Sequence, residues 1–116
     1  HYRLPSEDEW INACRAGGHA DFCGGNEPDF IAWYAGNSQN QPHTVGQKQA
    51  NPWGIYDMSG NVSEWTKSCV TNDCSKRVVC GGSWINSKTL LNLNAHDWLK
   101  ASFRNSRVGF RVVLDR

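Results

Sequence analysis

The stretch from Asp57 to Trp65, DMSGNVSEW, constrains the fold of this chain more than any other feature. It places two carboxylates, a glycine and a tryptophan within nine residues and shows neither helical nor strand periodicity. A second glycine-rich stretch, GGSW at 81–84, follows sixteen residues later. A backbone this irregular needs something to organise it. The two candidates are a bound cation and a framework of loops that requires this particular backbone shape.

Composition indicates one loop-rich domain. The chain has 116 residues, with six tryptophans and eleven glycines, which suits a core of scattered aromatic side chains. This length accommodates a single domain with a modest core. The net charge is +1 without a basic stripe, so nucleic acid is disfavoured as a partner. No apolar run reaches membrane-spanning length.

Five cysteines in polar, glycine-rich surroundings predict short disulfide loops in an exported protein. The spacings favour one loop between Cys14 and Cys23 and another between Cys69 and Cys74. Cys80 would then be left over, either buried as a small hydrophobic residue or paired with a segment outside this sequence. Zinc is the weaker interpretation because no two cysteines have the CxxC spacing.

One helix is clearly predicted, from about residue 7 to about residue 16. Ser6 is its expected N-cap, and Glu9 completes a capping box. Trp10 and Cys14 belong to its apolar face, and the two glycines at 17–18 should end it.

The remaining regular structure is expected to be sparse. Residues 30–34 form an apolar run that predicts either a short strand or a buried loop. Strands are predicted at 77–80 and at 108–113, the second with Phe110 and Val112 on one face. Residues 85–107 show no periodicity and are expected to form a loop. The chain therefore predicts an α+β domain that is mostly loop.

Six stretches carry a resemblance to a known family. In chain order they are RLPSEDEW at 3–10, VGQ at 45–47, NPWGIYDM at 51–58, GNVSEW at 60–65, GGSW at 81–84 and GFR at 109–111. They resemble the successive signatures of the formylglycine-generating enzyme (sulfatase-modifying factor) domain. The resemblance implies a C-type-lectin-like fold of the formylglycine-generating-enzyme type, with little regular secondary structure. It also implies that residues 1–116 are the C-terminal portion of one domain whose N-terminal portion lies outside this sequence.

The resemblance also implies a calcium ion at the irregular stretch. Its ligands would be the side chains of Asp57 and Glu64 and the backbone carbonyls of Gly60 and Val62. This set agrees with calcium chemistry, because calcium takes six to eight oxygen ligands and accepts carbonyls from a turning chain. The alternative is that the two carboxylates only cap backbone amides in the loop.

The catalytic positions differ from those of the family. The resemblance places two copper-binding cysteines at the second and seventh positions after the GGSW motif, where this chain has Asn86 and Leu91. Neither residue can supply a thiolate, so formylglycine generation is not expected. An enzyme with different, non-copper-thiolate chemistry, such as an exported oxidase or an accessory factor in natural-product maturation, is the alternative. A purely structural subunit is a third hypothesis.

Residues 85–107 have the composition of a binding face, because aromatic side chains are mixed with amides and charges. Their placement before a terminal GFR resembles the variable proteins of diversity-generating retroelements.

The sequence thus favours a non-catalytic, calcium-braced module that binds a ligand or receptor. It would belong to an exported bacterial-type protein that is periplasmic, at the cell surface or secreted. The expected partner is a protein or a small-molecule or glycan ligand, with the missing N-terminal portion as a further candidate. The predicted contacts are Trp84, Asn86, Asn94, His96, Asp97, Trp98, Phe103, Arg104, Asn105 and Arg107.

Overall fold

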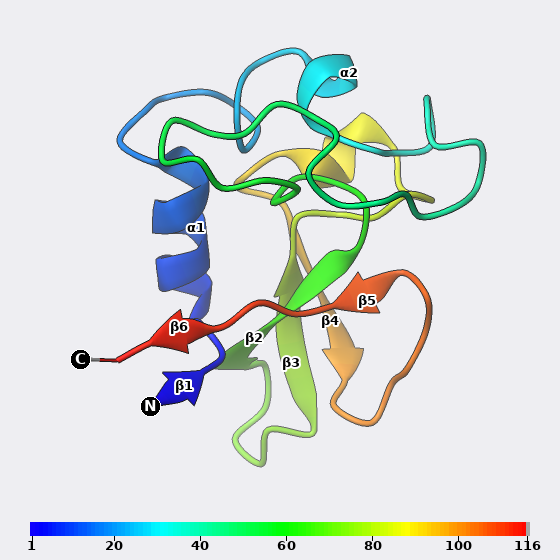
Figure 1. Cartoon of the computed structure of the whole chain (residues 1–116). Helices are drawn as coiled ribbons and strands as arrows, with labels where there is room; N and C mark the ends of the chain where they lie inside the picture. Colours follow the sequence, from blue (N-terminus) through cyan, green and yellow to red (C-terminus); the bar gives the residue numbers. More distant parts are fainter. Residues whose placement is uncertain (116) are drawn as a thin grey trace.

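The computed structural model describes residues 1–115 as two small sheets flanked by short helices (Figure 1). The larger sheet has the strand order β4-β3-β2-β5, and the smaller one pairs β1 with β6. Neighbouring strands are antiparallel except β2 and β5, which are parallel. The predicted α+β class is confirmed. The elements are β1 (Tyr2–Arg3), α1 (Glu7–Arg15), α2 (Pro28–Ile31), β2 (Ser63–Cys69), β3 (Lys76–Cys80), the 3-10 helix η1 (Lys88–Leu91), β4 (His96–Lys100), β5 (Val108–Gly109) and β6 (Val113–Leu114).

Helix α1 begins as its sequence predicts. The Ser6 Oγ accepts the Glu9 N–H at 3.1 Å, and the Glu9 Oε1 accepts the Ser6 N–H at 2.8 Å. This reciprocal pair satisfies two backbone donors that a helix start leaves open. The helix ends at Ala16, which adopts a left-handed conformation with φ of 48° just before the two predicted glycines.

The main core lies between α1 and the larger sheet. Trp10 and Cys14 project from the helix and are each only 1% exposed. They pack with Cys23, Met58, Val78, Cys80 and Leu93. A second, smaller cluster contains Ile31, Ala32 and Leu91, with Phe22 and Tyr34 packed against it. Burial of these side chains is the main favourable term that positions the loops.

Both predicted disulfides are confirmed. Cys14–Cys23 joins the end of α1 to the following loop, and Cys69–Cys74 closes the turn between β2 and β3. Cys80 forms no disulfide with any described residue and is 2% exposed, which confirms the buried alternative. Burial, followed by the nearby carboxylates of Glu7 and Glu64, raises the pKa of this thiol to about 12.

Several predicted elements are wrong in type or extent. The expected strand at 108–113 is divided into β5 and β6, and the intervening Phe110 and Val112 are 69% and 50% exposed. The apolar run at 30–34 is neither a strand nor wholly a loop, because α2 ends at Ile31 and Ala32 follows fully buried.

Two regions expected to be irregular contain regular structure. The 57–65 stretch leads directly into β2, and the 85–107 loop contains η1 and β4. Strand β4 forms because β3 offers it a backbone template, with Val79 opposite Asp97 and Val78 opposite Trp98. No helix in the described part of the chain is both long and apolar enough to cross a membrane.

Candidate functional site

The two glycine-containing signature stretches lie in direct backbone contact. The Gly60 N–H donates to the Gly81 carbonyl at 2.7 Å, and the Trp84 N–H donates to the Asn61 carbonyl at 2.8 Å. Gly81 has a φ of 96°, and a Cβ there would collide with the Met58 carbonyl oxygen. The glycine is required because only an unsubstituted residue permits this approach.

Asn61 connects this contact to two further segments. Its backbone N–H donates to the Trp33 carbonyl at 2.7 Å. Its side-chain Oδ1 accepts the His43 N–H at 2.9 Å, and its Nδ2 donates to the His43 carbonyl at 3.0 Å. The residue is 3% exposed, so its hydrogen bonds are made away from water. Asn61 therefore holds the loops that contain Trp33 and His43, neither of which pairs with a described strand.

Ser59 performs a similar role on the other side of the motif. Its hydroxyl accepts the Cys23 N–H at 2.9 Å and donates to the Leu91 carbonyl at 3.1 Å. The side chain is fully buried. One hydroxyl thus joins the loop after α1 to the end of η1.

Glu64 is buried in a network of hydrogen bonds. Its Oε1 accepts from the Trp10 Nε1 at 2.8 Å and from the Arg111 Nε at 2.7 Å. Its Oε2 accepts from the Arg111 guanidinium at 2.8 Å. Burial raises the pKa of Glu64 above its ordinary value, and the bonds from Arg111 and Trp10 oppose that rise.

Asp57 supplies the observation that bears on a metal. Its Oδ2 accepts the Gly46 N–H at 2.8 Å, whereas its Oδ1 is buried and has no hydrogen-bond partner. A buried carboxylate oxygen without a donor is the chemical environment that a hard cation satisfies. In the described part of the chain, no three His, Cys, Asp or Glu side chains gather closely enough to hold a metal ion by themselves. The expected calcium set has only two carboxylates and takes its other oxygens from the backbone, so the absence of such a group does not bear on it.

The two positions that carry cysteines in the resembled enzymes have structural roles here. The Asn86 Oδ1 accepts from both the Ser83 N–H at 2.8 Å and the Ser83 Oγ at 2.9 Å. Leu91 is fully buried in the smaller core cluster.

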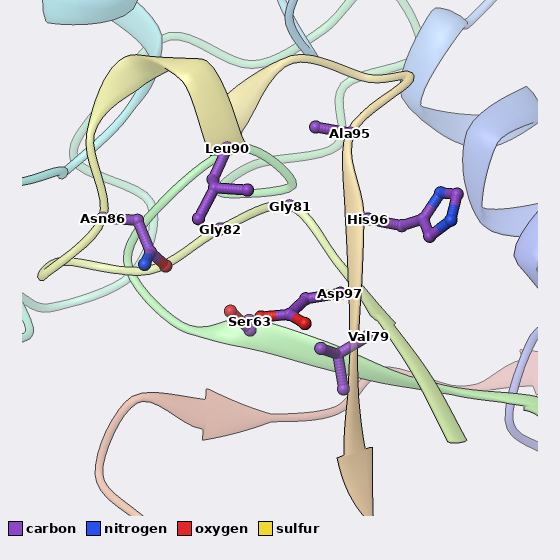
Figure 2. Close-up of a pocket in the computed structure, with 9 residues that line it drawn as sticks. All are labelled: Ser63, Val79, Gly81, Gly82, Asn86, Leu90, Ala95, His96 and Asp97. Carbon is purple, nitrogen blue, oxygen red and sulfur yellow. The ribbon is translucent and has the colours of Figure 1, made fainter. Parts of the chain in front are cut away.

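The cavity beside Asn86 has a volume of about 20 Å³, close to the space that one water requires. Figure 2 shows Asp97 directed toward Ser63 at this cavity, whereas His96 points away toward α1. The His96 Nδ1 lies 3.1 Å from the Glu7 Oε2 of that helix. The two neighbouring residues diverge because successive strand side chains alternate between faces.

The structure divides the predicted ligand contacts into two groups. Asn86, Asn94, His96 and Asp97 line a series of adjoining hollows that share lining residues. The central hollow is an open groove of about 620 Å³, and a smaller one of about 190 Å³ meets it at Asn94. Trp84 has a half-buried side chain and a backbone that is hydrogen-bonded to Asn61 and Ser38, so it belongs to the scaffold.

The second group lies at the other end of β4 and in the loop that follows it. In Figure 1 this orange segment extends away from η1. Lys76 lies over the Trp98 ring at 4.4 Å, and Arg107 lies over the Phe103 ring at 5.6 Å. These two aromatic residues, together with Arg104, Asn105 and Arg107, do not line the hollows beside Asn86.

Sequence reasoning missed one wall of the open groove. Phe22, Asn26, Glu27 and Pro28 form this wall, opposite residues 88–95. The available signal is the Asn-Glu-Pro turn beside an aromatic residue, but nothing local in it indicates which distant segment it faces.

Comparison with known proteins identifies the family. The family model described as sulfatase-modifying factor enzyme 1-like domain matches residues 1–116. The chain belongs to this family. The predicted fold of the formylglycine-generating-enzyme type is also confirmed by a solved structure, Treponema denticola variable protein 1. It superposes with a TM-score of 0.89 at 32% identity over 96% of this chain and 46% of that chain.

Two relatives found by sequence are described as two different kinds of protein. "Chaperone protein LppX" from Paenibacillus barcinonensis is 35% identical over 97% of this chain and 49% of its own length. "Inactive C-alpha-formylglycine-generating enzyme 2" from Bos taurus is 34% identical over 73% of this chain and 33% of its own length. The chain thus spans half or less of the length of these relatives.

Proposed function

We propose that this family member is a non-catalytic binding module. The observation that carries the proposal is the structural role of Asn86 and Leu91, the two residues at the positions where the resemblance implies copper-binding cysteines. Asn86 is hydrogen-bonded to Ser83, and Leu91 is part of the core. Neither side chain can bind copper as a thiolate. The nearby thiol of Cys80 is buried, with its pKa raised to about 12, so it does not replace them.

The proposed binding surface is the series of hollows lined by segment 86–97. Its walls are held by buried side chains such as Ser59, so the surface is organised before a ligand arrives. The similarity to a variable protein and to a relative described as inactive supports binding over catalysis. Two disulfides support an exported location, because such bonds persist in oxidising compartments.

The test is to map a library of small polar fragments onto the chain by backbone amide NMR. The expected shifts gather in residues 86–97 and in the wall at 22–28. Shifts that avoid both segments would contradict the proposed surface. A parallel assay follows oxygen consumption with a cysteine-containing peptide and copper(I). Oxygen consumption sustained above that of the same peptide and copper without the protein would overturn the non-catalytic assignment.

Calcium bracing is the second part of the proposal. The side chains of Asp57 and Glu64 and the carbonyls of Gly60 and Val62 would hold the ion. Bound calcium would supply positive charge to the unpartnered Asp57 Oδ1. Glu64 retains acceptor capacity at Oε2, which accepts one hydrogen bond from Arg111.

Calcium should raise the melting temperature of the chain relative to a chelator, because a ligand that binds only the folded state stabilises it. Asp57→Asn should remove most of that rise. Asp73→Asn, in the Cys69–Cys74 turn, is the matched control and should keep it. A melting temperature that is the same with calcium and with chelator would contradict the bracing.

A further inference from the structure

The open groove between residues 22–28 and 88–95 has features that specify a class of ligand. Its volume of about 620 Å³ lies within the range of small-molecule sites. Its two walls come from segments far apart in sequence. The inference that follows rests on the proposed binding function and concerns the central hollow of the same surface.

The walls of the groove are held in a fixed relation by the scaffold. The Leu93 N–H donates to the Asp21 carbonyl at 2.8 Å. Ser59 bonds to Cys23 on one side and to Leu91 on the other. The Cys14–Cys23 disulfide ties the first wall to α1. Rigid walls reduce the entropy lost when a ligand binds.

Two amide side chains in the lining of this groove have Nδ2 donors that bond to no described residue. The Asn26 Oδ1 accepts the Asp21 N–H at 2.8 Å, and the Asn92 Oδ1 accepts the Asn94 N–H at 2.9 Å. These bonds fix the plane of each amide and leave both Nδ2 groups free to donate. One such amide stands on each wall. They can hold a ligand that accepts hydrogen bonds at two separated points.

The rest of the lining supplies acceptors and one aromatic surface. The exposed Glu27 carboxylate is an acceptor, and the exposed Lys88 ammonium balances its charge. The groove therefore carries no net charge that would select an anion or a cation. Half-buried Phe22 offers a ring beside these polar groups.

A peptide fits this groove less well than a polyhydroxylated ligand. Peptides commonly add a strand to a sheet edge or place side chains in apolar pockets. The walls here are turns, the start of α2 and η1, so neither offers a strand edge. Hydroxyl groups both donate and accept, as the mixed lining requires. We infer that the groove binds a neutral saccharide, held by the Asn26 and Asn92 amide donors and the Glu27 acceptor.

The experiment titrates the ¹⁵N-labelled chain with a panel of neutral mono- and oligosaccharides at millimolar concentration. It follows the side-chain amide signals of Asn26 and Asn92. At least one saccharide should shift both signals. Asn26→Asp and Asn92→Asp keep the oxygen that accepts the backbone N–H and remove the free donor. Each should weaken binding about fivefold or more.

Asn72→Asp is the matched control, because Asn72 is exposed in the Cys69–Cys74 turn and should not affect binding. If one groove variant fails to fold, as judged by its melting temperature, the other still tests the inference. A panel in which no saccharide shifts either amide, or in which both variants bind like the native chain, would overturn it.

A parallel titration with a peptide library separates this inference from the proposed function. Peptides that shift the groove amides when saccharides do not would overturn the saccharide assignment and leave the binding module standing. If no compound of either panel, and none of the polar fragments, shifts any signal from the adjoining hollows, both proposals fail.

Discussion

At the scale of single residues, Glu64 shows why the GNVSEW motif contains an acid. The carboxylate is 4% exposed and lies at the junction of α1 and the C-terminal segment. Trp10 reaches it from α1 with an indole N–H, and Arg111 reaches it with two nitrogens. A buried charge is tolerated only when its partners replace the lost water. The RLPSEDEW, GNVSEW and GFR signatures therefore meet at one carboxylate.

Removing the Arg111 guanidinium from this network should lower the stability of the folded chain. Arg111→Met, measured in chelator, is expected to lower the free energy of unfolding by about 3 kcal/mol, because Glu64 is left buried without its counter-ion. The value lies at the lower end of the usual range since the Arg111 side chain is 32% exposed. The double variant with Glu64→Gln should regain part of the loss, because a neutral amide can still accept from Trp10. Chemical denaturation measures both, and a loss below about 1 kcal/mol in the single variant would contradict this account.

At the scale of elements, the helix could be predicted and two of the strands could not. Helix α1 is determined by local signals, namely the Ser6 cap, the Glu9 partner and the spacing of Trp10 and Cys14. Strand β4 has no such signal, because His96–Lys100 lacks alternation and depends on the hydrogen bonds of β3. Strand β2 could not be predicted because its first residues belong to the irregular 57–65 stretch. Short strands with exposed faces are decided by their neighbours rather than by their own composition.

The start of α1 should respond to acid. The Arg3 guanidinium, together with the Ser6 N–H, holds the pKa of Glu9 well below its ordinary value of 4.5. Because the folded pKa is depressed, this contribution to stability is fully present above the ordinary pKa and is lost as pH falls toward the folded one. Amide hydrogen exchange at residues 6–9, corrected for intrinsic rates, should therefore increase below about pH 4. Glu9→Gln keeps the capping box but lacks the charge, so its protection should change less with pH over this range. Equal pH dependence in both proteins would contradict the prediction.

At the scale of the whole molecule, buried polar side chains join loops that regular structure does not. Asn61 spans from His43 to Trp33 and Trp84, and Ser59 spans from Cys23 to Leu91. The six signatures identify the family, but these long-range bonds cannot be deduced from any local pattern. Such long-range contacts also explain why only part of the candidate site could be predicted from the sequence. Composition indicates a binding face at 85–107, of which segment 86–97 lines the hollows, whereas the 22–28 wall depends on the Ser59 contacts and the Cys14–Cys23 bond.

If Asn61 is a centre of this loop network, its side chain and its backbone conformation should contribute separately to stability. Asn61→Gly keeps the left-handed backbone, which has a φ of 62°, and loses only the two hydrogen bonds to His43. It should cost about 2 kcal/mol in the free energy of unfolding. Asn61→Ala loses the same bonds and, unlike Gly, keeps a Cβ in the left-handed conformation without the polar group that lets Asn tolerate it, which adds roughly 1 kcal/mol relative to Asn61→Gly. Denaturation of the two variants under identical conditions tests this ordering. Equal losses would mean that the backbone conformation contributes nothing. Negligible losses in both would mean that the His43 loop is held by the stacking of His43 on Trp33 and by its ring bond to the Ser38 carbonyl.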